Sequence, residues 1–143
     1  MGKVSNILRT KSKTILSVIA DTVVYDAIEL MCDHNVSAVV VMDNERLAGI
    51  FTERDYARKL ILKGKASKET LIGEVMTEDL ITVTPDTSID ECMRLMTGKL
   101  IRHLPVVEED RLVGIISIGD VVKYIIDEQK FIIENMEHYI TGS

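Results

Sequence analysis

The feature that most constrains this chain is an internal repeat. Residues 21–61 can be laid on residues 86–126 without a gap, at a constant offset of 65 (86 − 21 = 65). Identical pairs recur along this alignment: Leu30-Met31 with Leu95-Met96, Arg46-Leu47 with Arg111-Leu112, and Gly49-Ile50 with Gly114-Ile115. A gapless repeat of this kind indicates one supersecondary unit used twice. Any site that belongs to the unit is therefore expected to occur as a pair.

Composition limits how the two units fold and what they bind. The chain has 143 residues, and a unit of about fifty residues is too small to bury a sufficient core alone. We therefore expect the two units to share a core. A net charge of −6 argues against a nucleic-acid partner, which favours a basic surface. The local basic run from Arg54 to Lys68 is either a solvated helix face or an attraction for a small anion.

Several absences bear on where the protein works. No apolar run reaches the about 18 residues that a membrane-spanning helix requires, and the chain does not open with a signal-peptide pattern. Cys32 and Cys92 sit in apolar helical patterns without metal-ligand spacing, as expected for buried thiols in a reducing compartment. The sequence therefore predicts a soluble cytoplasmic protein with no membrane segment.

Each unit is predicted to run strand, helix, strand, strand, helix. Short apolar strands are expected at 15–18 and 81–83, and helices follow at 24–31 and from Ser88 to Gly98. The next two strands of each unit are expected to form a hairpin, 38–42 with 47–52 in the first unit and 104–107 with 112–117 in the second. A last helix in the first unit runs over 53–63 and stops at Gly64. The predicted class is α/β (α+β), with repeats at 10–63 and 75–128, a linker at 64–74 and a helical extension at 129–143.

The helical extension has no counterpart in the first unit. After Asp127 apolar residues continue at helical spacing through Phe131, Met136 and Ile140. Two interpretations stay open for this stripe: it packs against its own domain, or it forms a dimerisation or partner helix.

The strongest chemical signal is the strand-to-helix junction, which occurs in both units. It reads Gly-Ile-Phe-Thr-Glu-Arg-Asp at 49–55 and Gly-Ile-Ile-Ser-Ile-Gly-Asp at 114–120. A helix N-terminus with a hydroxyl side chain suits a phosphate, and a carboxylate one turn later suits the adjacent hydroxyls of a ribose. The alternative is that Thr or Ser followed by an acidic residue simply caps the helix. Duplication weakens this alternative without removing it, because duplication copies caps too.

These junctions, together with three further motifs, resemble a known family. The motifs are Val75-Met76-Thr77, Val83-Thr84-Pro85-Asp86-Thr87-Ser88 and Arg102-His103-Leu104-Pro105-Val106-Val107. The pattern is similar to tandem CBS domains, the pair called a Bateman module, over about residues 10–128. The resemblance implies two β-α-β-β-α units packed about a pseudo-twofold axis. It also implies a regulatory module without catalysis, with up to two clefts for AMP, ADP or ATP, and in some members NAD or S-adenosylmethionine.

The resemblance also assigns roles to individual residues. Asp55 and Asp120 would hold the riboses, while Thr52 and Ser117 would contact phosphate or ribose. Apolar residues would lie near the adenine slots, namely Ile15, Ile81, Ala38 and Leu104. Phosphate-contacting cations would come from Arg102, His103 and Arg54.

The two sites are not chemically equal in sequence. Arg54 of the first junction is replaced by Gly119 in the second, so the Asp120 site must take a cation elsewhere, from Lys123 or across the cleft. The second unit has Arg102-His103 where the first has Ser37-Ala38. We therefore expect different ligands or affinities at the two sites, a homodimer or a separate effector protein as the partner that receives the signal, and no metal site. The alternative functions are a structural dimerisation module without a ligand, or a nucleotide hydrolase.

Overall fold

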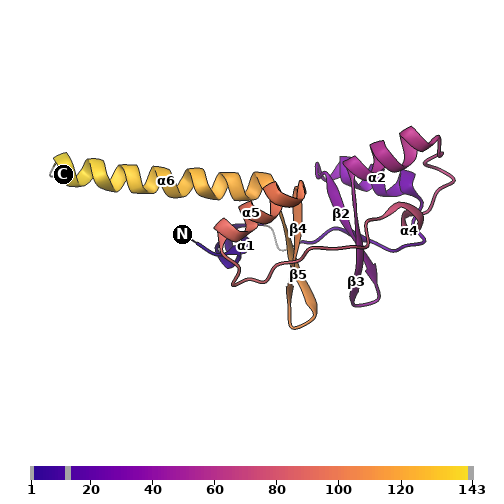
Figure 1. Cartoon of the computed structure of the whole chain (residues 1–143), viewed down its shortest axis with the longest axis horizontal. Coiled ribbons are helices and arrows are strands. Elements are labelled where there is room, and N and C mark those ends of the chain that lie inside the picture. Colours follow the sequence, from indigo (N-terminus) through magenta and orange to yellow (C-terminus); the bar gives the residue numbers. More distant parts are fainter. Residues whose placement is uncertain (1, 12–13, 142–143) are drawn as a thin grey trace.

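The computed structural model describes residues 2–11 and 14–141, and two β-hairpins stand at its centre (Figure 1). The first hairpin joins β2 (Ala38–Asp43) to β3 (Arg46–Thr52), and the second joins β4 (His103–Glu108) to β5 (Arg111–Ser117). Both pair in the same antiparallel register, with Val40 opposite Ile50 and Pro105 opposite Ile115. Each also has an irregularity at the same place, so the hairpins predicted from the repeat are confirmed.

The predicted outer strands are shorter than expected. The first is only β1 (Ser17–Val18), which pairs in parallel with β2. In the second unit the expected strand at 81–83 is reduced to one bridge between Val83 and Val106, at the positions equivalent to Val18 and Val41. The described residues therefore form a three-stranded sheet in one half and a two-stranded sheet in the other.

Helices flank the hairpins as the repeat predicts, with changed ends. They are α2 (Val24–Asp33) and α5 (Ile89–Lys99) after the outer strands, and α3 (Glu53–Asp55) and α6 (Ile118–Thr141) after the hairpins. Gly98 does not end α5: the helix continues to Lys99, and Leu100 takes the left-handed conformation at its C-cap. The expected helix over 53–63 changes after α3 into a π-helix and then a 3₁₀ turn, and ends at left-handed Gly64 as predicted.

A helix that the sequence did not suggest, α1 (Val4–Thr10), opens the described chain. It precedes the first repeat, yet its Val4 and Ile7 are buried in the core of the second, beside Ile89 and Leu104 (Figure 1). The backbone amide of Val4 donates to the carbonyl of Thr87 at 2.9 Å. The N-terminal segment therefore belongs physically to the half from which it is most distant in sequence.

The mirror arrangement holds for α4 (Ile72–Val75), which precedes the second repeat. Ile72 and Val75 are buried in the core of the first repeat, and the amide of Ile72 donates to Thr22, the repeat equivalent of Thr87, at 2.8 Å. We call α1 and α4 the exchanged helices. The predicted linker 64–74 thus contains Thr70 and Ile72, which are both buried.

The exchanged segments explain the glycine at the same position of both hairpins. A Cβ on Gly49 would lie 2.9 Å from the carbonyl oxygen of Thr77, just after α4. A Cβ on Gly114 would lie 2.7 Å from the side chain of Leu8 in α1. Each glycine therefore gives the incoming segment room to lie on the strand.

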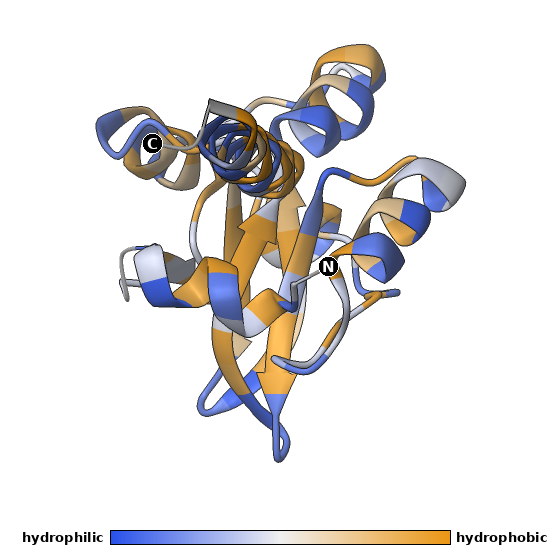
Figure 2. Cartoon of the chain, turned by 90° about the vertical axis from the view of Figure 1, so that its left-hand side faces the viewer, coloured by the Kyte–Doolittle hydropathy of each residue, from blue (hydrophilic) through white to orange (hydrophobic). Residues whose placement is uncertain are grey.

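The single shared core that we expected is in fact two buried clusters, one in each half. The strands are largely hydrophobic and have helices around them (Figure 2), and most of their apolar residues are buried. The halves depend on each other because each core is completed by a helix from the other half's leading segment. Of the two cysteines, Cys92 is buried as predicted, but Cys32 is exposed, so its predicted burial is wrong.

We expect the second core to require α1. Replacing Ile7 by Ala removes a side chain that is 5% exposed and should lower the free energy of unfolding by about 2–5 kcal/mol. Arg9→Ala changes an exposed residue of the same helix and should stay within about 0.5 kcal/mol. Urea denaturation followed by circular dichroism measures both variants. Equal stability of the two would show that α1 is not part of the core.

Candidate functional site

The two strand-to-helix junctions have the geometry of capping boxes. At the first, the Thr52 hydroxyl accepts the amide of Asp55 at 3.2 Å, and the Asp55 carboxylate accepts the amide of Thr52 at 3.0 Å. At the second, Ser117 and Asp120 make the same pair of hydrogen bonds at 3.1 and 2.8 Å. Each carboxylate therefore uses its Oδ2 atom to start a helix, and Oδ1 decides what else it can bind.

Asp55 has no free oxygen. Its Oδ1 accepts a hydrogen bond from the Thr77 hydroxyl at 3.1 Å and lies 3.2 Å from the ammonium of Lys59. Lys59 also donates to the carbonyl of Val75, so the cation is held in place. The Asp55 side chain is only 11% exposed. We call Thr52, Asp55, Lys59 and Thr77 the Asp55 site.

Asp120 is more open. The ammonium of Lys11 lies 2.6 Å from its Oδ2 and also donates to the carbonyl of Ile115 at 2.6 Å. Among the described residues nothing donates a hydrogen bond to its Oδ1, and the side chain is 27% exposed. Burial by itself would raise the pKa of Asp120, but the hydrogen bonds from Lys11 and Ser117 and the charge of Lys11 outweigh burial and lower that pKa.

Lys11 is the cation that the second junction lacks in sequence. It comes from the segment after α1, 109 residues away from Asp120 along the chain. No motif around Lys11 announces this contact, because it depends on the exchange of α1. Lys123, the residue suggested from the sequence, is exposed on α6 and makes no ion pair with Asp120 in the described structure.

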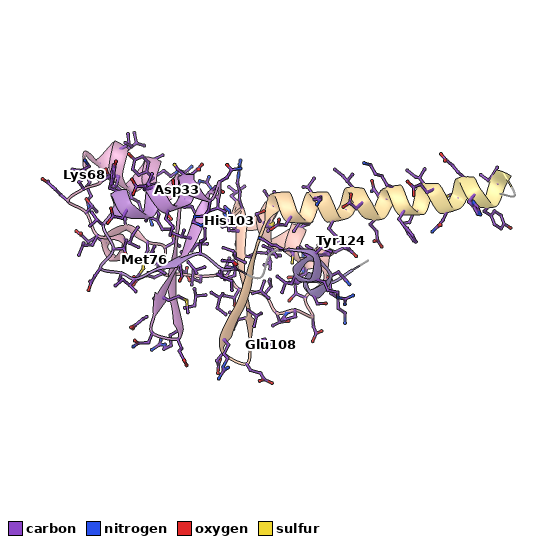
Figure 3. All side chains as sticks on the ribbon, turned by 180° about the vertical axis from the view of Figure 1, so that it is seen from behind. Asp33, Lys68, Met76, His103, Glu108 and Tyr124 are labelled. Carbon is purple, nitrogen blue, oxygen red and sulfur yellow. The ribbon has the colours of Figure 1, made fainter. Side chains whose placement is uncertain are left out.

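His103 lies between the two hairpins (Figure 3). Its Nε2 is 3.0 Å from the hydroxyl of Ser37 in the first repeat. Burial lowers the pKa of His103, and the positive charges of Lys11 and Arg102 lower it further against the opposing effect of Asp120. The imidazole is therefore held neutral close to the Lys11–Asp120 pair. We call Ser117, Asp120, Lys11 and His103 the Asp120 site.

The predicted arginines are placed differently from each other. Arg54 donates from Nη1 to the carbonyl of Leu100 at 2.6 Å, so it reaches from the first repeat to the end of α5 in the second. The Arg102 side chain is exposed, while its backbone carbonyl accepts the amide of Ile118 at the start of α6. In this structure Arg54 is thus a contact between repeats rather than a free cation beside Asp55.

The four residues predicted near the adenine slots lie in different surroundings. Ala38 and Leu104 are buried in β2 and β4, and Ile81 is half-buried against the core of the second repeat. Ile15 lines a hollow of about 340 Å³ together with Ser17, Met42, Glu45, Arg111 and Leu112. This hollow lies at the beginnings of β3 and β5, whereas Asp55 and Asp120 follow their ends. The carboxylate sites are therefore separate from it.

The described residues contain no cluster of three or more metal-ligating side chains, and no helix among them is long and apolar enough to cross a membrane. The arrangement at Asp120 instead offers one open carboxylate oxygen, one cation and a helix N-terminus. Such a set can accept hydrogen bonds from a diol and attract an anion.

The lowered pKa of Asp120 predicts how stability depends on pH. A folded-state pKa below the ordinary 3.8 adds stability above that value, and this stability is lost as the pH falls through the folded pKa. Asp120→Asn should therefore have a lower free energy of unfolding than the wild type near neutral pH. This difference, the stability gap, should disappear under acid conditions. Urea denaturation over a pH series measures the gap, with exposed Asp79→Asn as the control. A gap that stays constant with pH would contradict the ionic contribution.

Comparison with known proteins agrees with this architecture. A model of the CBS domain matches residues 4–62 and 72–127. The mitochondrial CBS domain-containing protein CBSX3 of Arabidopsis thaliana is 43% identical over an alignment 148 residues long. The alignment covers 97% of this chain and 72% of that protein.

Two solved structures extend the comparison. A protein with CBS domains from Burkholderia ambifaria superposes with a TM-score of 0.86 at 47% identity, covering 89% of this chain and 96% of that one. The CBS domain pair of protein MJ0100, solved with 5-methylthioadenosine and S-adenosyl-L-methionine, gives 0.79 at 27% identity, with coverages of 90% and 98%. The fold expected from the sequence is thus confirmed, and the chain belongs to the CBS-domain family, with two CBS domains in tandem.

Proposed function

We propose that this chain is a non-catalytic regulatory module that binds an adenosine-type ligand between its CBS repeats and signals to a partner. The observation that carries the proposal is the Oδ1 of Asp120 at the start of α6, which accepts no hydrogen bond from the described residues and lies beside the ammonium of Lys11. A ribose has two adjacent hydroxyls that can donate to such an oxygen. The MJ0100 pair, which shares this fold, was solved with two adenosine compounds.

The surroundings of Asp120 also suit the rest of a nucleotide. The N-terminus of the 24-residue helix α6 carries a partial positive charge that favours a phosphate. Lys11 adds a full positive charge, and the neutral imidazole of His103 offers a hydrogen-bonding nitrogen nearby. Ile81, half-buried in the same repeat, would contact the adenine from one side, and fully buried Leu104 would support that side from below.

The Asp55 site is proposed as the weaker of two. To bind a ribose, Asp55 would have to give up its contacts with Thr77 and Lys59, and Arg54 would have to leave the carbonyl of Leu100 to reach a phosphate. Breaking buried charge-assisted hydrogen bonds is costly. The sequence suggested that the two sites differ in ligand or affinity. We propose that the Asp120 site binds the ligand more tightly than the Asp55 site. In the weaker site, Thr52 would keep its phosphate or ribose role, and Ala38 and Ile15 would lie toward the adenine.

Lys11 gives the ligand a way to act at a distance. It follows α1, which packs against both β5 and α6. A ligand phosphate that attracts the Lys11 ammonium would weaken the contact of Lys11 with Asp120 and with it the seating of α1. Binding would then shift the population of α1 away from the position that it has in this structure.

We expect the two carboxylates to differ in a binding experiment. Asp120→Asn should weaken binding of AMP, ATP, NAD or S-adenosylmethionine at least about tenfold, because one ribose acceptor and its charge are lost. Asp55→Asn, the matched change at the equivalent position, should alter the affinity less than about threefold. Isothermal titration calorimetry measures both, after circular dichroism has established that each variant is folded.

Two results would contradict the proposal. Failure of every adenosine compound to bind the wild-type chain would remove the ligand function altogether. It would favour the alternative of a structural interaction module, whose melting temperature no ligand should change. Equal losses in Asp120→Asn and Asp55→Asn would keep the function but reject the direction of the inequality.

Lys11 separates anionic from neutral ligands. Lys11→Met should lower the affinity for AMP about tenfold, because the phosphate loses its counter-charge. The affinity for 5-methylthioadenosine, which has no phosphate, should change less than about threefold. The same substitution at Lys123 tests the cation expected from the sequence. An equal loss for both ligands in Lys11→Met would show that Lys11 does not contact a phosphate.

A further inference from the structure

The long helix α6 extends away from the body of the protein (Figure 1). Its first two turns are anchored, since Val121 is fully buried and Tyr124 and Ile125 pack against the core of the second repeat (Figures 1 and 3). From Gln129 onward every described side chain is exposed. The part of α6 from Gln129 to Thr141 would be only marginally stable in water as an isolated helix. We therefore expect a partner to cover it.

Five exposed apolar residues of α6, together with Gln129, form one continuous seam. Its members repeat at alternating spacings of four and three residues and are Val122, Ile126, Gln129, Ile133, Met136 and Ile140. This heptad spacing is that of a helix packing against another helix. Ile132 and Tyr139 flank the seam on one side, at 50% and 88% exposure, and Figure 2, which looks nearly along α6, shows hydrophobic residues gathered on one side of the helix.

Charge selects the orientation of the partner helix. The other flank of the seam carries Lys123, Lys130 and Glu137. In a parallel pair of identical helices this charged flank would face the apolar flank, with no opposite charges meeting. In an antiparallel pair like flanks meet, and each Glu137 lies beside Lys123 of the other copy. These two opposite-charge pairs outnumber the one like-charge contact, between the two copies of Lys130, and the helix dipoles also oppose each other.

We propose that α6 pairs antiparallel with α6 of a second copy of this chain along the seam. In this register Val122 lies opposite Ile140, Ile126 opposite Met136 and Gln129 opposite Ile133 of the other copy, and symmetry repeats each pair. All six seam positions are then covered at once, including Val122 and Ile126, which are 42% and 47% exposed although they lie near the body. The pairing does not rest on the ligand proposal and uses none of the residues of the Asp120 site.

A matched pair of variants tests the seam. Ile133→Asp places a carboxylate in the seam, and Phe131→Asp makes the same kind of change on the outer face of the same helix. Both residues are exposed in the single chain, at 54% and 62%, so neither substitution removes core packing. In sedimentation velocity over a dilution series, Ile133→Asp should raise the dimer dissociation constant at least about tenfold, and Phe131→Asp less than about threefold.

Disulfide trapping tests the orientation and the register. In a Cys32→Ser background, Ile126→Cys/Met136→Cys should form a covalent dimer on mild oxidation, because the two thiols face each other across the pair. Ile126→Cys alone should not, since the two copies of that position lie about 15 Å apart along the helix axis. Covalent dimers from the single variant would indicate a parallel pair and overturn the orientation.

The wild-type chain supplies the decisive outcome. A monomer at every concentration would overturn the proposal and leave the seam to a different protein. Equal loss of association in Ile133→Asp and Phe131→Asp would show unspecific hydrophobic association and would overturn it as well. Ligand binding by calorimetry is measured separately, so failure of the pairing and failure of the ligand function are distinguishable.

Discussion

The exchange of α1 and α4 between the halves is the constraint on which the rest of the structure depends. Each core is completed by a helix from the leading segment of the other half. Helix α1 contributes Val4 and Ile7 to the core of the second repeat, and α4 contributes Ile72 and Val75 to the core of the first. Units of this size bury too little apolar surface to be stable alone. The exchange therefore makes folding of one repeat conditional on the other, and it fixes how the two hairpins sit.

The same exchange makes the two carboxylate sites unequal. The segment after α4 brings Thr77 to Asp55, which also holds Lys59 from its own helix, and the carboxylate becomes saturated. The segment after α1 brings Lys11 to Asp120, and the other carboxylate oxygen accepts no hydrogen bond within the described part of the chain. Both aspartates cap helices, so capping and ligand binding are compatible roles at Asp120, where separate oxygens serve them. The structural and functional readings of the junction motif are thus not exclusive.

Helix α6 joins the candidate ligand site to the candidate interface. Its first turn carries Asp120, its second packs against the core and α1, and its remaining turns carry the seam. The proposed ligand and the proposed partner would therefore act on opposite ends of one helix, with Lys11 and α1 beside its base.

The sequence by itself determined the duplicated unit, the two hairpins, the capping residues and the long final helix, because these depend on local apolar runs, helical spacing and helix-start chemistry. The outer strands predicted from the sequence were too long, and the predicted end of α5 at Gly98 was wrong. A single parallel bridge and a left-handed Leu100 leave no local signal in the sequence. Only the tertiary structure decided which cation meets Asp120 and that Asp55 is saturated. Lys11 and Asp120 are 109 residues apart, and their meeting follows from the exchange of helices, which no spacing within either repeat records.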